Sequence, residues 1–360
     1  MDQEIVANLC YMFWDVASSA ELRALSPSKV RPTTIQYISF VLSIITCIIG
    51  FAANLLVIFI TGSLMKKNKY KIWFLNLALA DFAFLLFLPF TAESIIRGSW
   101  RYGSIVCKLY NFLTFVNTYA SIYILTALNI DRALSVAKPI WHLRFRSRRF
   151  CCFICALIWV SSAVCSIPAI IYSDVHANNL CTLSYYDISN FAQTFSDLFD
   201  KNEPSDLFPR EICKNLSDIF PISVRREIGT EWKEATSTAM CLVLTLAVVG
   251  YCIPLCVIVS SNIIIAVHVK NSRMVASSRL YRLVIVGVMS FFCTRTPYVL
   301  TYITVLVSIF TLKMTLTYKL SAVLPLLFSI AATNSFLNPV VYVLAVKEAR
   351  SEILHFFRKK

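Results

Sequence analysis

Long apolar blocks alternate with shorter polar ones along this chain. Uncharged apolar runs cover residues 35–61, 109–130, 150–173, 235–267 and 320–346, and two further runs, near 72–96 and 283–309, each hold a charge expected to be buried. A helix that crosses a bilayer needs about 20 mostly apolar residues. Because only helices and closed barrels satisfy every backbone group in lipid, the pattern predicts an all-α membrane protein, a seven-transmembrane helix bundle.

Polar segments flank and interrupt this expected bundle. Residues 1–34 are of mixed composition and are expected to form an extracellular tail, followed by the bundle over 35–345. Inside it, residues 173–234 form a polar connection far longer than usual, which indicates either a functional loop or a disordered one. Residues 346–360 begin with an amphipathic pattern, which predicts a short eighth helix in contact with membrane lipids, followed by a short cytoplasmic tail.

The charge distribution orients the expected helices. The chain is 58% hydrophobic and only 15% charged, with a net charge of +14. If the amino terminus lies outside, the inner segments hold 18 Lys and Arg but only two acids, Glu348 and Glu352. An excess of basic residues on the cytoplasmic side is the rule for membrane proteins, so the amino terminus is expected to be extracellular. The basic residues thus orient the protein in the membrane, and no nucleic-acid partner is expected.

The sequence shows no sign of enzyme chemistry. Its four histidines are scattered, with no metal-ligand spacing and no nucleophile beside a base, so no catalytic residue, metal or cofactor is expected. A transporter is disfavoured because the two halves of the chain show no inverted repeat. Four of the 13 cysteines fall on the expected outer, oxidising side, namely Cys10, Cys107, Cys181 and Cys213.

Several polar residues inside the apolar runs are candidates for function. Asp81 lies near mid-membrane, where an acid is a functional candidate, although a protonated Asp that is hydrogen-bonded inside the bundle is the plain alternative. Asn117 and Ser121 are four residues apart, hence on one helix face, at the depth expected of Asp81. Asp131 and Arg132 end the third run, where the arginine could also simply reach the headgroups.

These landmarks together resemble the rhodopsin-like (class A) G-protein-coupled receptors, over residues 35–357. One signature residue falls in each expected helix: Asn54, Asp81, Arg132, Trp159, Pro254, Pro297 and Pro339. Residues 338–342, Asn-Pro-Val-Val-Tyr, match the NPxxY motif of that family. Residues 73–78 (WFLNLA) and 138–141 (KPIW) resemble the chemoattractant branch, which includes formyl-peptide, chemerin and complement-anaphylatoxin receptors.

The resemblance implies a plasma-membrane receptor that binds an extracellular peptide or protein ligand and engages a heterotrimeric G protein. It implies a cytoplasmic cleft with Arg132, Asn262 and Tyr342, with Asp131 pairing Arg132 at rest and Asn338 and Pro339 as switch residues. It also implies a disulfide between Cys107 and Cys181, which leaves Cys10 and Cys213 able to pair with each other. The residues expected to meet the ligand are Glu93, Tyr185, Tyr186 and Arg295, and Asn215 is an expected glycosylation site.

Three departures from the family pattern favour a second function, a decoy receptor that binds ligand without signalling. The DRY motif ends in Ala133, Asn262 stands where a tyrosine is usual, and Arg295 replaces the tryptophan of the CWxP motif.

Two competing hypotheses concern the role of Arg295. In related receptors a sodium ion lies among the residues that match Asp81, Asn117, Ser121, Asn334 and Asn338. An arginine at this depth needs a partner, so Arg295 is expected either to replace sodium as the counter-charge of Asp81, directly or through one water, or to face a ligand pocket and bind an acidic ligand group.

Overall fold

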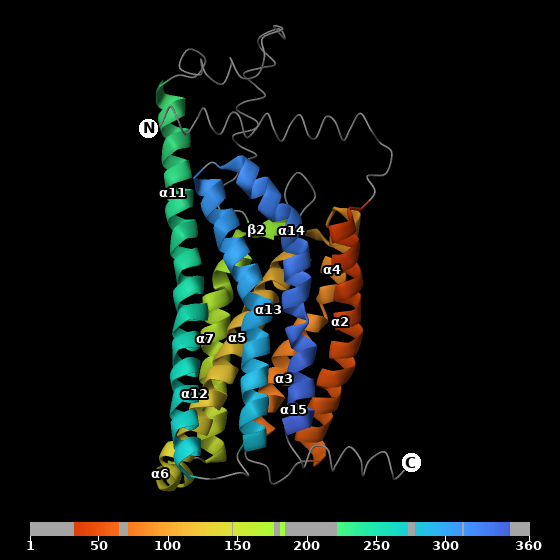
Figure 1. Cartoon of the computed structure of the whole chain (residues 1–360). Helices are drawn as coiled ribbons and strands as arrows, with labels where there is room; N and C mark the ends of the chain where they lie inside the picture. Colours follow the sequence, from red (N-terminus) through yellow and green to blue (C-terminus); the bar gives the residue numbers. More distant parts are fainter. Residues whose placement is uncertain are drawn as a thin grey trace.

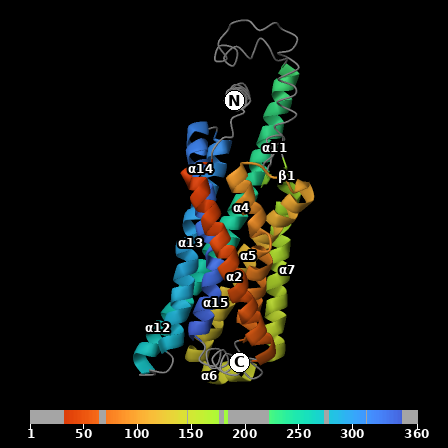
Figure 2. The ribbon, with the colours of Figure 1, turned by 90° about the vertical axis from the view of Figure 1, so that its right-hand side faces the viewer.

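The computed structural model describes residues 32–64, 71–145, 147–175, 181–183, 222–272, 278–311 and 313–345. In these ranges the protein is a bundle of long, roughly aligned helices with one small hairpin (Figures 1 and 2). The helices are α2 (Thr34–Phe59), α3 (Lys71–Leu85), α4 (Leu88–Arg97), α5 (Gly103–Ala137), α6 (Pro139–Phe145), α7 (Arg148–Tyr172), α11 (Ile222–Ala247), α12 (Ile253–Ser272), α13 (Ser278–Phe310), α14 (Met314–Ala332) and α15 (Asn334–Ala345). Two π-helices, η1 (Ile60–Leu64) and η2 (Val248–Cys252), and strands β1 (Ser173–Val175) and β2 (Cys181–Leu183) complete the described elements.

Six helical stretches in this part of the chain are long and apolar enough to cross a membrane. They are Thr34–Gly62, Lys71–Arg97, Gly103–Ala137, Arg148–Tyr172, Trp232–His268 and Lys319–Val340. The helix over the remaining apolar run, α13, has 33 residues but is not one of the six. The helical membrane protein is therefore confirmed, and the count of seven spans stays a prediction. The expected eighth helix lies outside the described residues.

Two of the prolines coincide with interruptions of the long helices. Pro89 stands in the first turn of α4, directly after the break that separates α4 from α3. Pro254 follows η2 in the fifth span. Proline lacks an N–H and clashes with the preceding turn, and at these two positions the chain accommodates it by a helix break and by a π-bulge. At Gly250 in η2 an added Cβ would lie 2.7 Å from the Tyr119 ring, so this bulge packs against α5 only because the residue is glycine.

A hairpin covers one end of the bundle, hereafter the hairpin end, and α6 lies at the opposite end, the α6 end (Figures 1 and 2). Strands β1 and β2 pair antiparallel, with Val175 opposite Cys181. The expected disulfide between Cys107 and Cys181 is present and ties β2 to the first turns of α5. The side chain of Ser104 also donates to Asp174 Oδ1 at 2.5 Å, and Lys108 forms an ion pair with Asp174 at 3.6 Å, so the disulfide and these contacts hold the hairpin on α5.

The connection expected over 173–234 is shorter in the structure, because α11 already begins at Ile222. Both views show α11 rising beyond the other helices at the hairpin end (Figures 1 and 2). The charges of residues 222–234 end the apolar run and so predict a loop, but Glu, Lys and Arg are good helix formers outside lipid. Trp232 in this extension is buried near Phe310 of α13, with ring centroids 5.9 Å apart.

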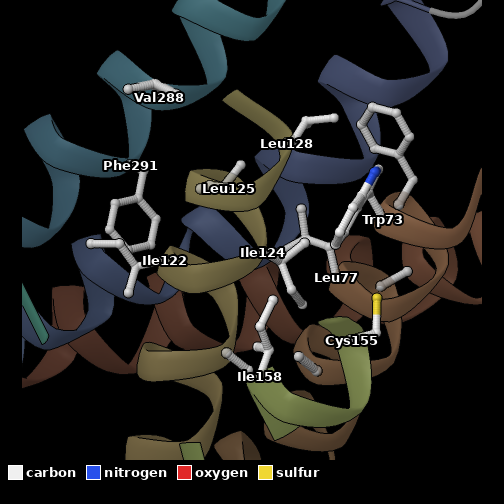
Figure 3. Packing of buried hydrophobic residues seen from close by; sticks show 14 of the residues in the cluster. Trp73, Leu77, Ile122, Ile124, Leu125, Leu128, Cys155, Ile158, Val288 and Phe291 are labelled. Carbon is white, nitrogen blue, oxygen red and sulfur yellow. The ribbon is translucent and has the colours of Figure 1, made fainter. Parts of the chain in front are cut away.

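The main hydrophobic core joins α3, α5, α7 and α13. Leu77, Ile124, Ile158 and Phe291 are among its buried side chains (Figure 3). On the outside of the bundle many large apolar side chains are exposed, such as Ile48, Val160 and Ile171. A surface of this kind is stable in lipid and unfavourable in water, in agreement with a membrane protein.

Candidate functional site

Asp81 on α3 is fully buried and held by two amides. Asn117 on α5 donates from Nδ2 to its Oδ1 at 3.0 Å, and Asn338 on α15 donates from Nδ2 to its Oδ2 at 2.8 Å. The carboxylate thus joins three helices that are far apart in the sequence. Two hydrogen bonds to a buried carboxylate stabilise it in place of the water that it has lost.

Arg295 on α13 reaches the same network through Asn117. Its Nη2 donates to Asn117 Oδ1 at 3.1 Å and its Nη1 donates to Thr118 Oγ1 at 2.7 Å. The guanidinium carbon also lies 5.6 Å from the centroid of the Phe291 ring, within the range of a cation–π contact. The expected pairing of Arg295 with Asp81 is therefore indirect: within the described part of the chain the two charges make no direct ion pair, and one amide bridges them.

The other two residues of the expected sodium-like site are buried but do not join this hydrogen-bond network. Ser121 and Asn334 are fully buried, yet their side chains have no hydrogen-bond partner among the described residues. Nearby, Asn54 Nδ2 donates to the backbone oxygens of Gly50 and Ser335, at 2.8 and 2.7 Å, which links α2 to α15. Asp81, Asn117, Asn338 and Arg295 thus form one connected cluster, hereafter the polar cluster.

A small, partly open cavity lies next to the polar cluster. Its walls come from α3, α5, α11, α13 and α14, and most of its lining residues are aromatic or aliphatic. They are Phe84, Thr114, Phe115, Thr118, Leu246, Arg295, Tyr298, Val299, Tyr302, Phe328, Ala331 and Ala332. Arg295 therefore belongs to both the polar cluster and the cavity. The two hypotheses raised by the sequence are compatible in this geometry.

At the α6 end, Asp131 contacts His142. Asp131 Oδ1 and His142 Nε2 are 3.0 Å apart, and both side chains are buried. This contact fixes α6 on the end of α5. The expected pairing of Asp131 with Arg132 stays a prediction. On α12, Asn262 donates from Nδ2 to the backbone oxygen of Ile258 at 2.9 Å.

The remaining candidate residues lie away from the cavity or outside the described part of the structure. Glu93 forms an ion pair with Arg97 at 2.5 Å and is not among the residues that line the cavity. Pro339 lies inside α15, as expected of the NPxxY motif. The side chain of Tyr342 and the residues Tyr185, Tyr186, Asn215, Cys10 and Cys213 lie outside the described part of the structure.

Sequence reasoning missed Thr118, Tyr298 and His142. Tyr298 could have been found, because it lies three residues after Arg295 and so on the same helix face. Thr118 follows Asn117 directly, and neighbouring helix positions point about 100° apart, so no periodic signal connects them. Nothing in the sequence indicated that His142 contacts Asp131, because this contact depends on how the short α6 is placed against the end of α5.

Comparisons with known proteins agree with this geometry. A family model described as "7 transmembrane receptor (rhodopsin family)" matches residues 53–199. The C3a anaphylatoxin chemotactic receptor of Oncorhynchus mykiss is 30% identical over 341 residues, which cover 94% of this chain and 82% of that receptor. The chemerin-like receptor 1 of Homo sapiens is 29% identical over 329 residues, covering 89% of this chain and 78% of that receptor. These relatives are receptors and not enzymes, and this chain belongs to the rhodopsin family of seven-transmembrane receptors, in its chemoattractant-receptor branch.

Proposed function

We propose that this protein is a receptor for a chemoattractant-type peptide and signals through a heterotrimeric G protein. The observation that carries the proposal is a series of hydrogen bonds that runs from the cavity to α15. Arg295 lines the cavity and bonds Asn117, Asn117 bonds Asp81, and Asp81 bonds Asn338 next to Pro339. A ligand that shifts Arg295 therefore acts on the helix that carries the NPxxY motif.

The proposed orientation puts the hairpin end outside the cell and the α6 end inside. The basic residues of the inner segments support it. Residues 1–34 then form an extracellular tail, Asn215 is open to glycosylation, and residues 346–360 lie on the inner membrane surface. The connection after β2, with Tyr185, Tyr186 and several acids, would attract a basic peptide before it enters the cavity.

At the α6 end, Arg132, Asn262 and Tyr342 are proposed to line the cleft that the G protein enters. Ala133 removes a ring and a hydroxyl from the rim of this cleft but leaves the charge of Arg132 unchanged. We therefore expect coupling that is weakened and not abolished.

The polar cluster is proposed to work without a sodium ion. Asp81 is already held by two amides, and the permanent charge of Arg295 lies one amide away. A guanidinium in this place supplies the positive charge that a bound cation would otherwise bring.

The test is a G-protein activation assay in cells that display the receptor, with a panel of chemoattractant peptides. Wild type is expected to respond to an active peptide, and Arg132→Ala to respond at least roughly tenfold less. Arg148→Ala, which removes an exposed arginine at the same end of the bundle, is the matched control and should respond as wild type does. If a peptide binds and is internalised while wild type and Arg132→Ala give the same absence of signal, the protein is a decoy receptor and the signalling proposal is wrong.

A further inference from the structure

Exposed basic residues gather where α6 meets α7. Residues 133–150 hold five lysines and arginines and no acidic residue. Four of the five are in the described part of the chain, and their side chains are exposed: Lys138, Arg144, Arg148 and Arg149. Lys138, Arg148 and Arg149 form no ion pair with any described residue. The positive charge at this corner of the bundle is therefore available to an anionic partner.

Helical geometry separates the two arginines that begin α7. Consecutive residues of an α-helix point about 100° apart. Arg148 is three residues before Cys151 and seven before Cys155, which are buried in the main core, so it begins the face of α7 that packs on the bundle. Arg149 is four residues before the exposed Phe153, so it begins the face that points away from the bundle.

The outer face of α7 continues beyond Arg149 as an apolar stripe. Its exposed side chains recur every three or four residues: Phe150, Phe153, Leu157 and Val160. From Phe150 to Val160 the helix rises about 15 Å, which equals the hydrocarbon thickness of one leaflet. Because α7 is a candidate span that begins at Arg148, Arg149 lies at the level of the lipid headgroups. This face of α7 thus offers one site for a headgroup and one for an acyl chain.

α6 adds positive charge beside this face. It lies at the end of the bundle (Figures 1 and 2), fixed there by the contact of 3.0 Å between Asp131 Oδ1 and His142 Nε2. Only residues 146 and 147 separate α6 from α7, so Arg144 is five positions before Arg149. A cluster of basic residues at the end of a membrane helix, with no acid among them, favours a headgroup that carries more than one negative charge.

We propose that the corner between α6 and α7 binds a phospholipid of the inner leaflet whose headgroup carries more than one phosphate. The headgroup lies against Arg149, with Lys138 and Arg144 as further positive groups, and an acyl chain lies along the apolar stripe of α7. The inner leaflet as the source rests on the proposed orientation of the receptor. The binding itself involves neither the cavity nor the polar cluster.

A general attraction between basic residues and an anionic membrane is the competing explanation. Such an attraction depends on the number of charges near the surface and not on the face of the helix that carries them. A bound lipid, in contrast, depends on Arg149, which begins the outer face, and not on Arg148, which begins the bundle face. The two arginines are neighbours with the same charge and the same exposure class, so they separate the two explanations.

The experiment measures the thermal midpoint of the purified full chain in lipid nanodiscs, without extracellular ligand or G protein. Discs of phosphatidylcholine alone are compared with discs that also contain phosphatidylinositol bisphosphate or, at the same total charge, phosphatidylserine. A lipid that binds only the folded protein raises the midpoint with its concentration. The bisphosphate is expected to give a larger rise than phosphatidylserine. Soluble inositol trisphosphate, added to phosphatidylcholine discs, is expected to give none, because it lacks the acyl chains.

Four variants complete the test. Arg149→Gln should require at least roughly tenfold more bisphosphate for the same rise, and Arg149→Lys should keep most of the response because the charge remains. Arg148→Gln removes the same charge from the neighbouring position and is the matched control, which should respond as wild type does. Arg144→Gln removes a charge from α6 and should also weaken the response, which covers the case in which Arg149→Gln fails to fold.

The outcomes separate a bound lipid from a general attraction. Equal rises with the bisphosphate and with phosphatidylserine, equal losses in Arg148→Gln and Arg149→Gln, or an undiminished response in Arg149→Gln and Arg144→Gln overturn the proposal. A rise with inositol trisphosphate as large as that with the lipid also overturns it, because the stripe of α7 would then contribute nothing. Since the assay contains no ligand and no G protein, a failure of lipid binding leaves the signalling proposal standing, and a failure of signalling leaves this result unchanged.

Discussion

The coupling between Asp81 and Arg295 can be measured with a double-mutant cycle. The two changes are Asp81→Asn and Arg295→Gln, made singly and together. Asp81→Asn replaces the carboxylate with an amide of the same shape, and Arg295→Gln removes the charge with part of the side chain. The contacts that Arg295→Gln loses with Thr118 and Phe291 occur in both arms of the cycle, so the cycle isolates the interaction with Asp81. In the structure that interaction passes through Asn117, whose amide bonds Arg295 at 3.1 Å and Asp81 at 3.0 Å.

The expected coupling follows from this geometry. One amide and two hydrogen bonds separate the charges by roughly 6–8 Å, which gives about 2–3 kcal/mol at an effective dielectric constant of about 20. A direct ion pair at about 4 Å would give about 4 kcal/mol on the same scale. Asp81→Asn alone is expected to destabilise the protein by a similar 2–3 kcal/mol, because Arg295 then remains buried without an acid nearby.

The assay is thermal unfolding of the four proteins in the same nanodiscs, with stabilities compared at one temperature. The exposed Arg101 supplies the control cycle, since Asp81→Asn with Arg101→Gln should show a coupling near zero. A coupling near zero for Asp81 with Arg295 would refute the bridge through Asn117. A neutral Asp81→Asn with a loss of ligand binding alone in Arg295→Ala would show that Arg295 serves only the cavity.

Three further perturbations test other parts of the structure. Arg295→Trp should gain a sodium-dependent rise in thermal midpoint that wild type lacks, and a variant unresponsive to sodium would contradict the replacement of the cation. Cys107→Ser opens a link across 74 residues and should lower stability by about 4 kcal/mol on the loop-entropy estimate; peptide mapping that finds Cys107 alkylatable in folded protein would contradict the disulfide. His142→Ala should lower stability by about 1–3 kcal/mol, because it removes a buried hydrogen-bond partner of Asp131; an unchanged thermal midpoint would show that this contact contributes nothing.

The helices could be predicted from the sequence because lipid imposes a strong constraint on hydrophobicity. The apolar run 109–130 lies inside α5, which extends from Gly103 to Ala137. The apolar run marks only the part of the helix that lipid surrounds. Beyond that part the helix continues in polar surroundings, because backbone hydrogen bonds and helix propensity still favour it there. The early start of α11 was missed for the same reason, since hydrophobicity carries no information about a helix beyond the membrane.

The residues of the polar cluster could be proposed from the sequence, but the hydrogen bonds among them could not. Depth along each helix follows from counting residues, and it indicated that Asp81, Asn117, Ser121 and Arg295 lie at one level, while the family resemblance added Asn334 and Asn338. In the structure Asp81, Asn117, Asn338 and Arg295 are linked by hydrogen bonds, and the side chains of Ser121 and Asn334 have no partner among the described residues. Which atoms bond depends on the rotation of α5 against α13, because that rotation decides whether the Asn117 amide lies between the two charges. The sequence fixes no such rotation, because it is set by the packing of side chains such as Phe291 and Ile122 between helices (Figure 3).

The energetics of Arg295 explain why a charge in this position can serve as a switch. An arginine at the centre of a membrane helix costs about 2.5–3.5 kcal/mol on insertion scales. The contact with Phe291 and the attraction to Asp81 offset that cost at rest, each by about 1–3 kcal/mol. An acidic ligand group at the guanidinium would repel Asp81, so the net attraction that holds Asp81 towards Arg295 would fall. Asp81 then depends more on Asn338, so the ligand changes the balance of forces on α15 without contacting it.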